Sequence, residues 1–134
     1  MIWGFTQDKA EAYLVEGFKQ TRLITSEIAE IIEELNRTYG FISMVADCGG
    51  LGKSMVEEMR RRFGLPLKAA EKRSKFSYIE LFNDGLRTER IKVIDGCSIF
   101  DEWDLLQWDE NRNKEDARFE NHLADAALYG WREC

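Results

Sequence analysis

The spacing of apolar residues along the chain predicts strands that alternate with helices. Two runs rich in strand-forming residues, Ile2–Thr6 and Glu11–Phe18, flank a polar stretch that is typical of a hairpin turn. Residues 19–24 predict a third short antiparallel strand. Phe41–Ala46 is a continuous apolar run of strand length, as expected for a buried central strand. Further short strands are predicted at residues 65–70 and 90–94.

Helices are predicted where apolar residues recur at every third or fourth position. Thr25 or Ser26 offers an N-cap to the first helix, and Gly40 offers its stop. Later helices are predicted at residues 53–63, 74–86, 98–108 and 115–132. The acids of the 98–108 helix, Glu102 among them, are expected on a solvated face. Antiparallel strands followed by helix–strand–helix units predict an α/β domain with a mixed sheet.

Composition narrows the class of protein. The chain has 134 residues, 44% of them hydrophobic and 33% charged, which is typical of a single folded domain. No apolar run is long enough to cross a bilayer and no signal peptide is visible, so no membrane partner is expected. The net charge of -6 argues against a protein that coats nucleic acid. The three scattered cysteines are expected to be reduced thiols in a cytosolic protein, because their spacing fits neither a disulfide framework nor a zinc site.

The segment VADCGGLGKS, from Val45 to Ser54, ends like a nucleotide-binding P-loop. The first glycine of that motif would have to stand where the chain has Asp47, whose charge would face the bound phosphates. We therefore expect no bound nucleotide. Asp47 instead follows the predicted central strand, at the carboxyl end where α/β sheets place their chemistry. It either holds a metal ion or caps the turn, and its spacing alone leaves both open.

A second candidate site lies near the end of the chain. His122 and Asp125 are three residues apart and share one face of the predicted last helix, and the small Ala124 and Ala126 flank the acid. Small residues let a helix lie close to a sheet, which would bring the carboxylate to the strand ends. Taken alone, the pair also fits an exposed acid and a core or surface histidine. If the two elements converge over the sheet, Asp47 and Asp125 would supply the paired carboxylates that a hard divalent cation requires.

Three segments resemble, in their order and spacing, the C-terminal nuclease domain of the phage terminase large subunit: VADCGGLGKSMVEEMRRRFGLP, AAEKRSKFSYIELFNDGLRTERIKV and RFENHLADAALYGWR. The resemblance covers most of the chain from about Thr25 onward, and its specific parts are the Asp-x-Gly-Gly turn and the His-x-x-Asp-Ala helix. It implies a ribonuclease H-like fold, a mixed sheet flanked by helices. It also implies cleavage of double-stranded DNA during genome packaging, with Mg²⁺ or Mn²⁺ held by an acidic cluster. Asp47 and Asp125 match metal-binding acids of that cluster, and His122 matches the histidine beside them.

The same resemblance implies a DNA-facing surface and protein partners. The segment AAEKRSK resembles the family's Glu-Lys-x-x-Lys segment, so Lys72, Arg73 and Lys75 are expected to face DNA. Lys53 either contacts a phosphate near the metal site or is an exposed helix start. The implied partners are the portal and the small terminase subunit of a packaging motor. The implied location is the cytoplasm of a phage-infected or prophage-carrying bacterium.

One position departs from the family pattern. The family has another catalytic aspartate on its first strand, where this chain has Ile2, and Asp8 in the hairpin turn is the nearest possible third carboxylate. The family's ATPase domain does not precede the nuclease segment here, so we expect either a fragment or a stand-alone remnant, with residues 1–134 forming one nuclease domain. Two alternatives stay open. One is an incomplete domain that binds DNA or packaging partners without cutting, and the other is a Holliday-junction resolvase of the same fold.

Overall fold

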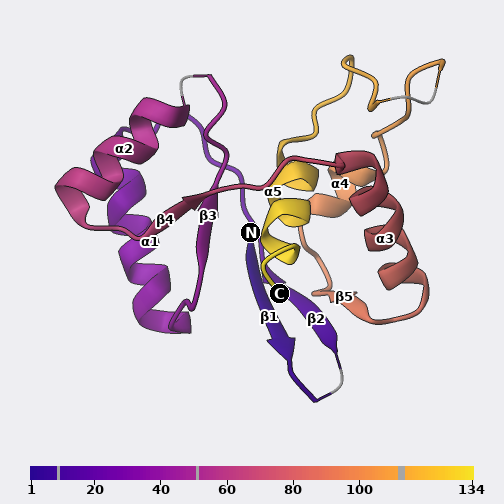
Figure 1. Ribbon diagram of the computed structural model, residues 1–134, viewed down its shortest axis with the longest axis horizontal. Coiled ribbons are helices and arrows are strands. Elements are labelled where there is room, and N and C mark those ends of the chain that lie inside the picture. Colours follow the sequence, from indigo (N-terminus) through magenta and orange to yellow (C-terminus); the bar gives the residue numbers. More distant parts are fainter. Residues whose placement is uncertain (9, 51, 112–113) are drawn as a thin grey trace. The chain divides into compact units, whose positions relative to one another are not determined.

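The computed structural model describes residues 1–8, 10–50, 52–111 and 114–134 (Figure 1). Residue 9 of the predicted hairpin turn and residue 51 of the glycine turn therefore lie outside the described part. The chain forms two compact units. One, here called the discontinuous unit, combines Met1–Lys19 with Glu71–Cys134, and the other, the inserted unit, is Gln20–Ala70. None of the helices in the described ranges is long and apolar enough to span a bilayer.

A three-stranded mixed sheet forms the framework of the discontinuous unit. Its strands are β1 (Ile2–Thr6), β2 (Glu11–Glu16) and β5 (Ile91–Val93), in the order β1-β2-β5. β1 pairs with β2 in the antiparallel sense, and β5 pairs with β2 in the parallel sense. The predicted first hairpin and the predicted mixed sheet are thus confirmed.

Three helices pack on one face of this sheet. They are α3 (Lys75–Arg87), α4 (Ile99–Trp103) and α5 (His122–Trp131). Leu14 of β2 packs with Ile99 and Leu123, and Ala12 packs with Phe82. Ala12 and Leu14 are two residues apart on one strand, so they point to the same face, and the helices must cover that face. Burying each large apolar side chain there stabilises the unit by roughly 1.5–3 kcal/mol.

The inserted unit has its own strands, helices and apolar core. Its elements are α1 (Thr25–Tyr39), β3 (Met44–Ala46), α2 (Gly52–Phe63) and β4 (Leu67–Ala69). β3 and β4 form a two-stranded parallel sheet, as the βαβ pattern of the sequence predicts. Ala29 of α1 packs with Val56 and Met59 of α2 and with Leu67 of β4. Gly40 ends α1 at a φ of 64°, the left-handed conformation that glycine adopts without strain.

Several predicted elements are shorter than expected or missing. Residues 19–24 form no strand, and Arg22 has a φ of 66°, which a strand cannot accommodate. Within the described part of the chain, the predicted central strand is reduced to Met44–Ala46 and pairs with β4 alone. The predicted 98–108 helix is limited to α4, and the last helix begins at His122 instead of residue 115.

Candidate active site

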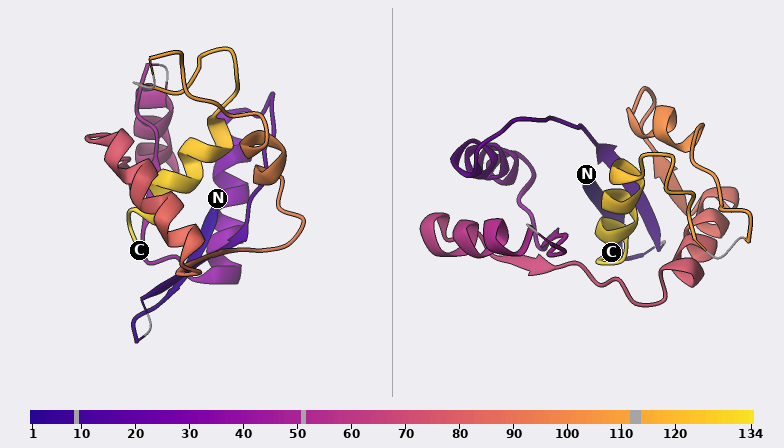
Figure 2. Two further views of the ribbon diagram at one scale, coloured as in Figure 1. Left: turned by 90° about the vertical axis from the view of Figure 1, so that its right-hand side faces the viewer. Right: turned by 90° about the horizontal axis from the view of Figure 1, so that it is seen from above.

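Helix α5, which carries Asp125, lies directly against the first strand (Figures 1 and 2). The indole N–H of Trp3 on β1 donates a hydrogen bond of 3.0 Å to the carbonyl of Ala127. One turn later, a Cβ atom on Gly130 would lie 2.6 Å from Cδ1 of Trp3, so only glycine permits this approach. The predicted close contact between helix and sheet is present, but Ala127 and Gly130 make it, and Ala126 is exposed.

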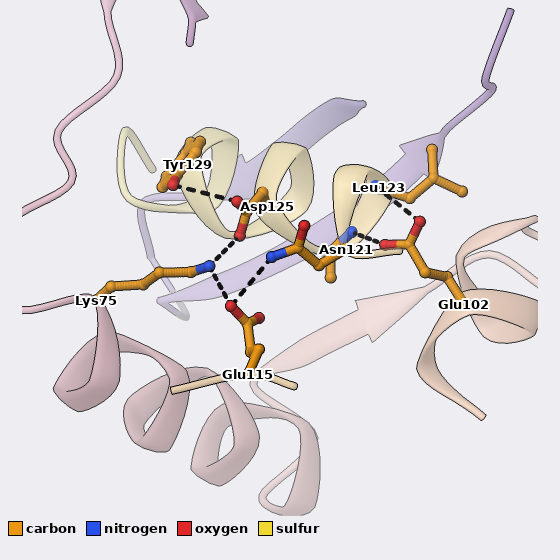
Figure 3. A network of polar contacts seen from close by, with 8 residues as sticks. Lys75, Glu102, Glu115, Asn121, Leu123, Asp125 and Tyr129 are labelled. Carbon is orange, nitrogen blue, oxygen red and sulfur yellow. Dashed lines mark hydrogen bonds and ion pairs between the residues drawn. The ribbon is translucent and has the colours of Figure 1, made fainter. Parts of the chain in front are cut away.

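The amino terminus of α5 is held by a buried carboxylate. Glu102 of α4 is only 9% exposed, and its side chain accepts hydrogen bonds from the amide N–H groups of Leu123, at 3.2 Å, and Ala124, at 2.7 Å (Figure 3). A carboxylate suits this position because the first amides of a helix lack partners within the helix and carry partial positive charge. The expectation that Glu102 lies on a solvated face is therefore wrong. Glu102 anchors the helix that positions Asp125.

Asp125 takes part in a cluster of charged and polar side chains within the discontinuous unit (Figure 3). The ammonium of Lys75, the first residue of α3, lies 2.5 Å from Oδ1 of Asp125 and also forms an ion pair with Oε2 of Glu115. The amide nitrogen of Asn121 donates to the same Glu115 oxygen at 3.1 Å. The hydroxyl of Tyr129 makes a longer contact, 3.4 Å, with Oδ2 of Asp125. One cation thus joins two carboxylates that come from a loop and a helix.

Burial and ion pairing act in opposite directions on the pKa values of Asp125 and Lys75. Burial raises the pKa of Asp125, because the loss of water around the carboxylate outweighs the opposing effect of Lys75. Burial also acts to lower the pKa of Lys75, but the contacts with Asp125 and Glu115 more than offset it, so this pKa is raised. Lys75 is consequently a full positive charge at neutral pH.

The chemistry of these residues can be compared with what a divalent metal requires. No group of three or more His, Cys, Asp or Glu side chains is placed to hold a metal among residues 1–8, 10–50, 52–111 and 114–134. Oδ1 of Asp125 is nevertheless buried and accepts no well-directed hydrogen bond; its contact is the Lys75 ammonium. Because two carboxylates already share one cationic group, Asp125 and Glu115 fit a cation, with further oxygen ligands to come from elsewhere.

The structure shows what Asp47 does within the inserted unit. Its Oδ1 accepts a 2.7 Å hydrogen bond from the N–H of Gly49, and the residue is exposed at the carboxyl end of β3. A Cβ atom on Gly52 would lie 2.4 Å from the carbonyl oxygen of Asp47, so this turn depends on glycine. Asp47 therefore caps the turn, the second of the two roles considered above. Its convergence with Asp125 stays a prediction, because the two acids belong to different units.

The other predicted site residues fall into two groups. His122 and Asp8 are exposed, His122 at the first position of α5 and Asp8 in the β1–β2 turn, and Ile2 is buried in β1. The second group is basic. Lys53 is exposed on α2, and Arg73 pairs with Glu71. The ammonium of Lys72 lies 5.9 Å from the centre of the Tyr129 ring. Their contact with DNA stays a prediction.

Two functional candidates escaped the sequence analysis. Glu102 belongs to a short helix rich in acids, and Glu115 lies in a polar loop, so neither has a local signal that separates it from a solvated acid. Glu115 and Asn121 also border a pocket of about 590 Å³ beside α3 and α5, together with Lys75, His122, Phe76 and Trp108. This volume is ample for a small polar ligand.

Comparison with known proteins bears on the fold. No protein-family model matches the chain, and no curated protein sequence is significantly similar to it. The structure is similar to a crystal structure of the nuclease domain of g2p, the large terminase of bacteriophage SPP1, with bound Mn. The TM-score is 0.65 and the sequence identity 16%, over 98% of this chain and 75% of that chain.

The chain has the fold of a large-terminase nuclease domain. The resemblance inferred from the Asp-x-Gly-Gly and His-x-x-Asp-Ala segments is confirmed at this level, as is the α/β class with a mixed sheet flanked by helices. At 16% identity the likeness establishes the fold, and activity has to be argued from the residues of the site.

Proposed function

We propose that this protein is a metal-dependent endonuclease that cleaves double-stranded DNA, in the manner of a terminase nuclease domain during phage genome packaging. The observation that carries the proposal is the position of Asp125. The chain has the fold of a terminase nuclease, and Asp125 lies on a helix that Trp3 and Glu102 hold in place. Its Oδ1 is buried and is paired with the ammonium of Lys75.

Different residues of the chain would bind the metal, position the reacting groups and contact the DNA. Asp125 and Asp47 would hold Mg²⁺ or Mn²⁺, which when bound polarises a phosphate and acidifies a water molecule. His122, which is exposed one turn before Asp125, would orient a carboxylate or the attacking water. Lys53, Lys72 and Arg73 are exposed cations that would neutralise backbone phosphates on the DNA. A role in packaging would add the portal and the small terminase subunit as partners, in the cytoplasm of an infected or prophage-carrying bacterium.

Cleavage of linear duplex DNA with Mg²⁺ or Mn²⁺ tests this proposal. Asp125→Asn and Asp47→Asn should each reduce cleavage by about a hundredfold or more, because each removes a metal ligand while keeping the side chain's shape. Asp101→Asn is a matched control, since Asp101 is an exposed acid on α4. Cleavage that is undiminished in both site variants would refute the assignment. Strong preference for four-way over linear DNA would favour a junction resolvase.

A second candidate function is a domain that binds DNA or packaging partners without cutting. It is favoured by the absence, within the described ranges, of a group of three metal-ligating side chains. Ile2→Asp distinguishes the two, since the resemblance aligns Ile2 with the family's first-strand acid and Ile2 is only 7% exposed. A buried aspartate would be tolerated only beside a cation. If Ile2→Asp raises Mn²⁺ affinity and cleavage together, the site is a nuclease site that lacks one ligand; if it only destabilises the fold, the binding function is favoured.

A further inference from the structure

The ammonium of Lys75 occupies a defined position between two acids. It lies 2.5 Å from Oδ1 of Asp125 and is also paired with Oε2 of Glu115. All three side chains are shielded, with exposed fractions of 26% for Lys75, 14% for Glu115 and 23% for Asp125. The contacts are therefore less screened by water than those of a surface salt bridge.

The surrounding residues hold the acids in place. Asn121 donates to the Glu115 oxygen that faces Lys75, and its own carbonyl accepts a 2.8 Å hydrogen bond from the amide of Asp125. Glu102 fixes the first turn of the same helix. The carboxylates of Asp125 and Glu115 are thus positioned by the backbone and by Asn121. Lys75, on α3, contacts both of them.

The position of the ammonium nitrogen is also suited to a metal ion. Oxygen ligands lie at about 2.3–2.6 Å from Ca²⁺ and about 2.0–2.1 Å from Mg²⁺, so a cation at the ammonium position, 2.5 Å from Oδ1 of Asp125, would be at Ca²⁺ distance and about 0.4 Å too far for Mg²⁺. One ammonium facing two carboxylates leaves the cluster with an excess of negative charge. A divalent cation at the same point would balance both acids.

We propose that Lys75 is a resident counter-ion that occupies a cation position shared by Asp125 and Glu115, so that a divalent metal binds there only by displacing it. Glu115 is then a metal ligand in addition to Asp125. The inference rests on the proposed function, since it concerns the metal that Asp125 is proposed to hold. Lys75 also lines the pocket of about 590 Å³ described above, which gives the displaced side chain a solvated place to move into.

Binding of Mn²⁺ to the unmodified chain and to Lys75→Met, measured by titration calorimetry and by the electron paramagnetic resonance signal of free Mn²⁺, tests the proposal. Lys75→Met should bind Mn²⁺ about tenfold or more tightly, because it removes a competing positive charge at contact distance. Lys114→Met is the matched control, since Lys114 is an exposed lysine of the same pocket, and it should change the affinity by about twofold at most.

A double variant, Lys75→Met with Glu115→Gln, separates the role of Glu115 from a general effect of charge. It leaves Asp125 as the single acid of the cluster, so most of the gain in Mn²⁺ affinity should disappear. A gain that persists in the double variant would overturn the assignment of Glu115. Equal affinities for the unmodified chain and Lys75→Met would overturn the displacement by metal.

Thermal unfolding with EDTA and with Mn²⁺ gives a second measurement that needs no activity. Lys75→Met should have a lower Tm than the unmodified chain in EDTA and a larger rise in Tm on adding Mn²⁺. Should Lys75→Met fail to fold in EDTA, Lys75→Gln keeps a hydrogen-bond donor without the charge and should show the same larger rise. An equal rise in the unmodified chain and in the folded variant would contradict the proposal.

Asp125→Asn keeps this test distinct from that of the proposed function. If Asp125→Asn binds Mn²⁺ as well as the unmodified chain, the metal-binding role of Asp125 fails and with it the proposed function. If Asp125→Asn loses binding but Lys75→Met gains none, the inference about Lys75 alone is wrong.

Discussion

The indole of Trp3 and the carbonyl of Ala127 are joined by a 3.0 Å hydrogen bond although 124 positions separate them in the sequence. This contact ties the first strand to the helix that bears Asp125, and it is made possible by Gly130, whose missing side chain leaves room for the indole. The position of Asp125 on α5 therefore depends on Trp3, an aromatic residue of β1 that packs against this helix.

Gly130→Ala should destabilise the discontinuous unit. The added methyl group would lie 2.6 Å from Cδ1 of Trp3, and overpacking of this kind costs about 1–3 kcal/mol, more than the gain of about 1 kcal/mol expected from alanine in a helix. Urea unfolding would measure the loss. In a Trp3→Leu background the same substitution should cost less, and an equal cost in both backgrounds would show that Trp3 is not the obstacle.

Glu102→Ala should also destabilise the fold, by about 1–3 kcal/mol, because it leaves the amides of Leu123 and Ala124 buried without an acceptor. Glu102→Gln retains one acceptor oxygen and should lose less. Asp101→Ala, a change at the exposed neighbouring acid, is the control and should alter the urea midpoint little. If the unfolding midpoints of Glu102→Ala and Asp101→Ala coincide, Glu102 does not cap α5 in solution.

Asp116 provides a prediction on pH. A side-chain hydrogen bond from Arg118, supported by the backbone N–H of Arg118, lowers the pKa of Asp116 to about 2 from its usual 3.8. A carboxyl group with a lowered folded-state pKa adds stability that is present above the unfolded-state value and is lost as the pH falls through the folded-state value. Stability should therefore fall between about pH 4 and pH 2, and this part of the fall should be absent in Asp116→Asn. The effect should be small, because Arg118 is largely exposed to water.

Urea midpoints measured from pH 5 to pH 2 would test this expectation. Asp95→Asn, at an exposed acid in a turn, controls for the loss of one carboxyl group. Parallel curves for Asp116→Asn and the unmodified chain would show that the pair with Arg118 does not persist in solution.

Nucleotide should not bind at the turn between β3 and α2. Asp47 occupies the amide of Gly49 with its own carboxylate, and its negative charge would repel phosphates that a P-loop holds with backbone N–H groups. Calorimetric titration with ATP should show only nonspecific binding. Micromolar affinity that disappears in Lys53→Ala would mean that the turn is a nucleotide site after all.

The sequence predicted a helix or strand correctly where the contacts that define it are made between residues close together in the sequence. The β1–β2 hairpin, the stop of α1 at Gly40 and the extent of α2 follow from apolar periodicity and glycine, and the structure confirms them. The strand expected at residues 19–24 is wrong, because β-propensity there had no partner strand to act on.

The residues of the candidate site likewise divide into those with a local signal in the sequence and those without one. Asp125 and Asp47 stood out because small residues and glycines surround them, which is a local signal. Glu102 and Glu115 had none, because their roles arise from partners 22 and 40 residues away, at Ala124 and Lys75. A polar residue in a short helix or loop acquires such a role only once the tertiary structure is formed.

The insertion of residues 20–70 between the two parts of the discontinuous unit affects the order of events during synthesis. The β1–β2 hairpin leaves the ribosome early, but α5, which covers Trp3 and Leu14, is translated more than a hundred positions later. At about 5–20 residues per second, the apolar face of the hairpin waits on the order of ten seconds for its cover. The inserted unit contains its whole core within one continuous stretch and can close in the meantime. Until α5 is made, the apolar face of the hairpin is exposed and can take part in aggregation.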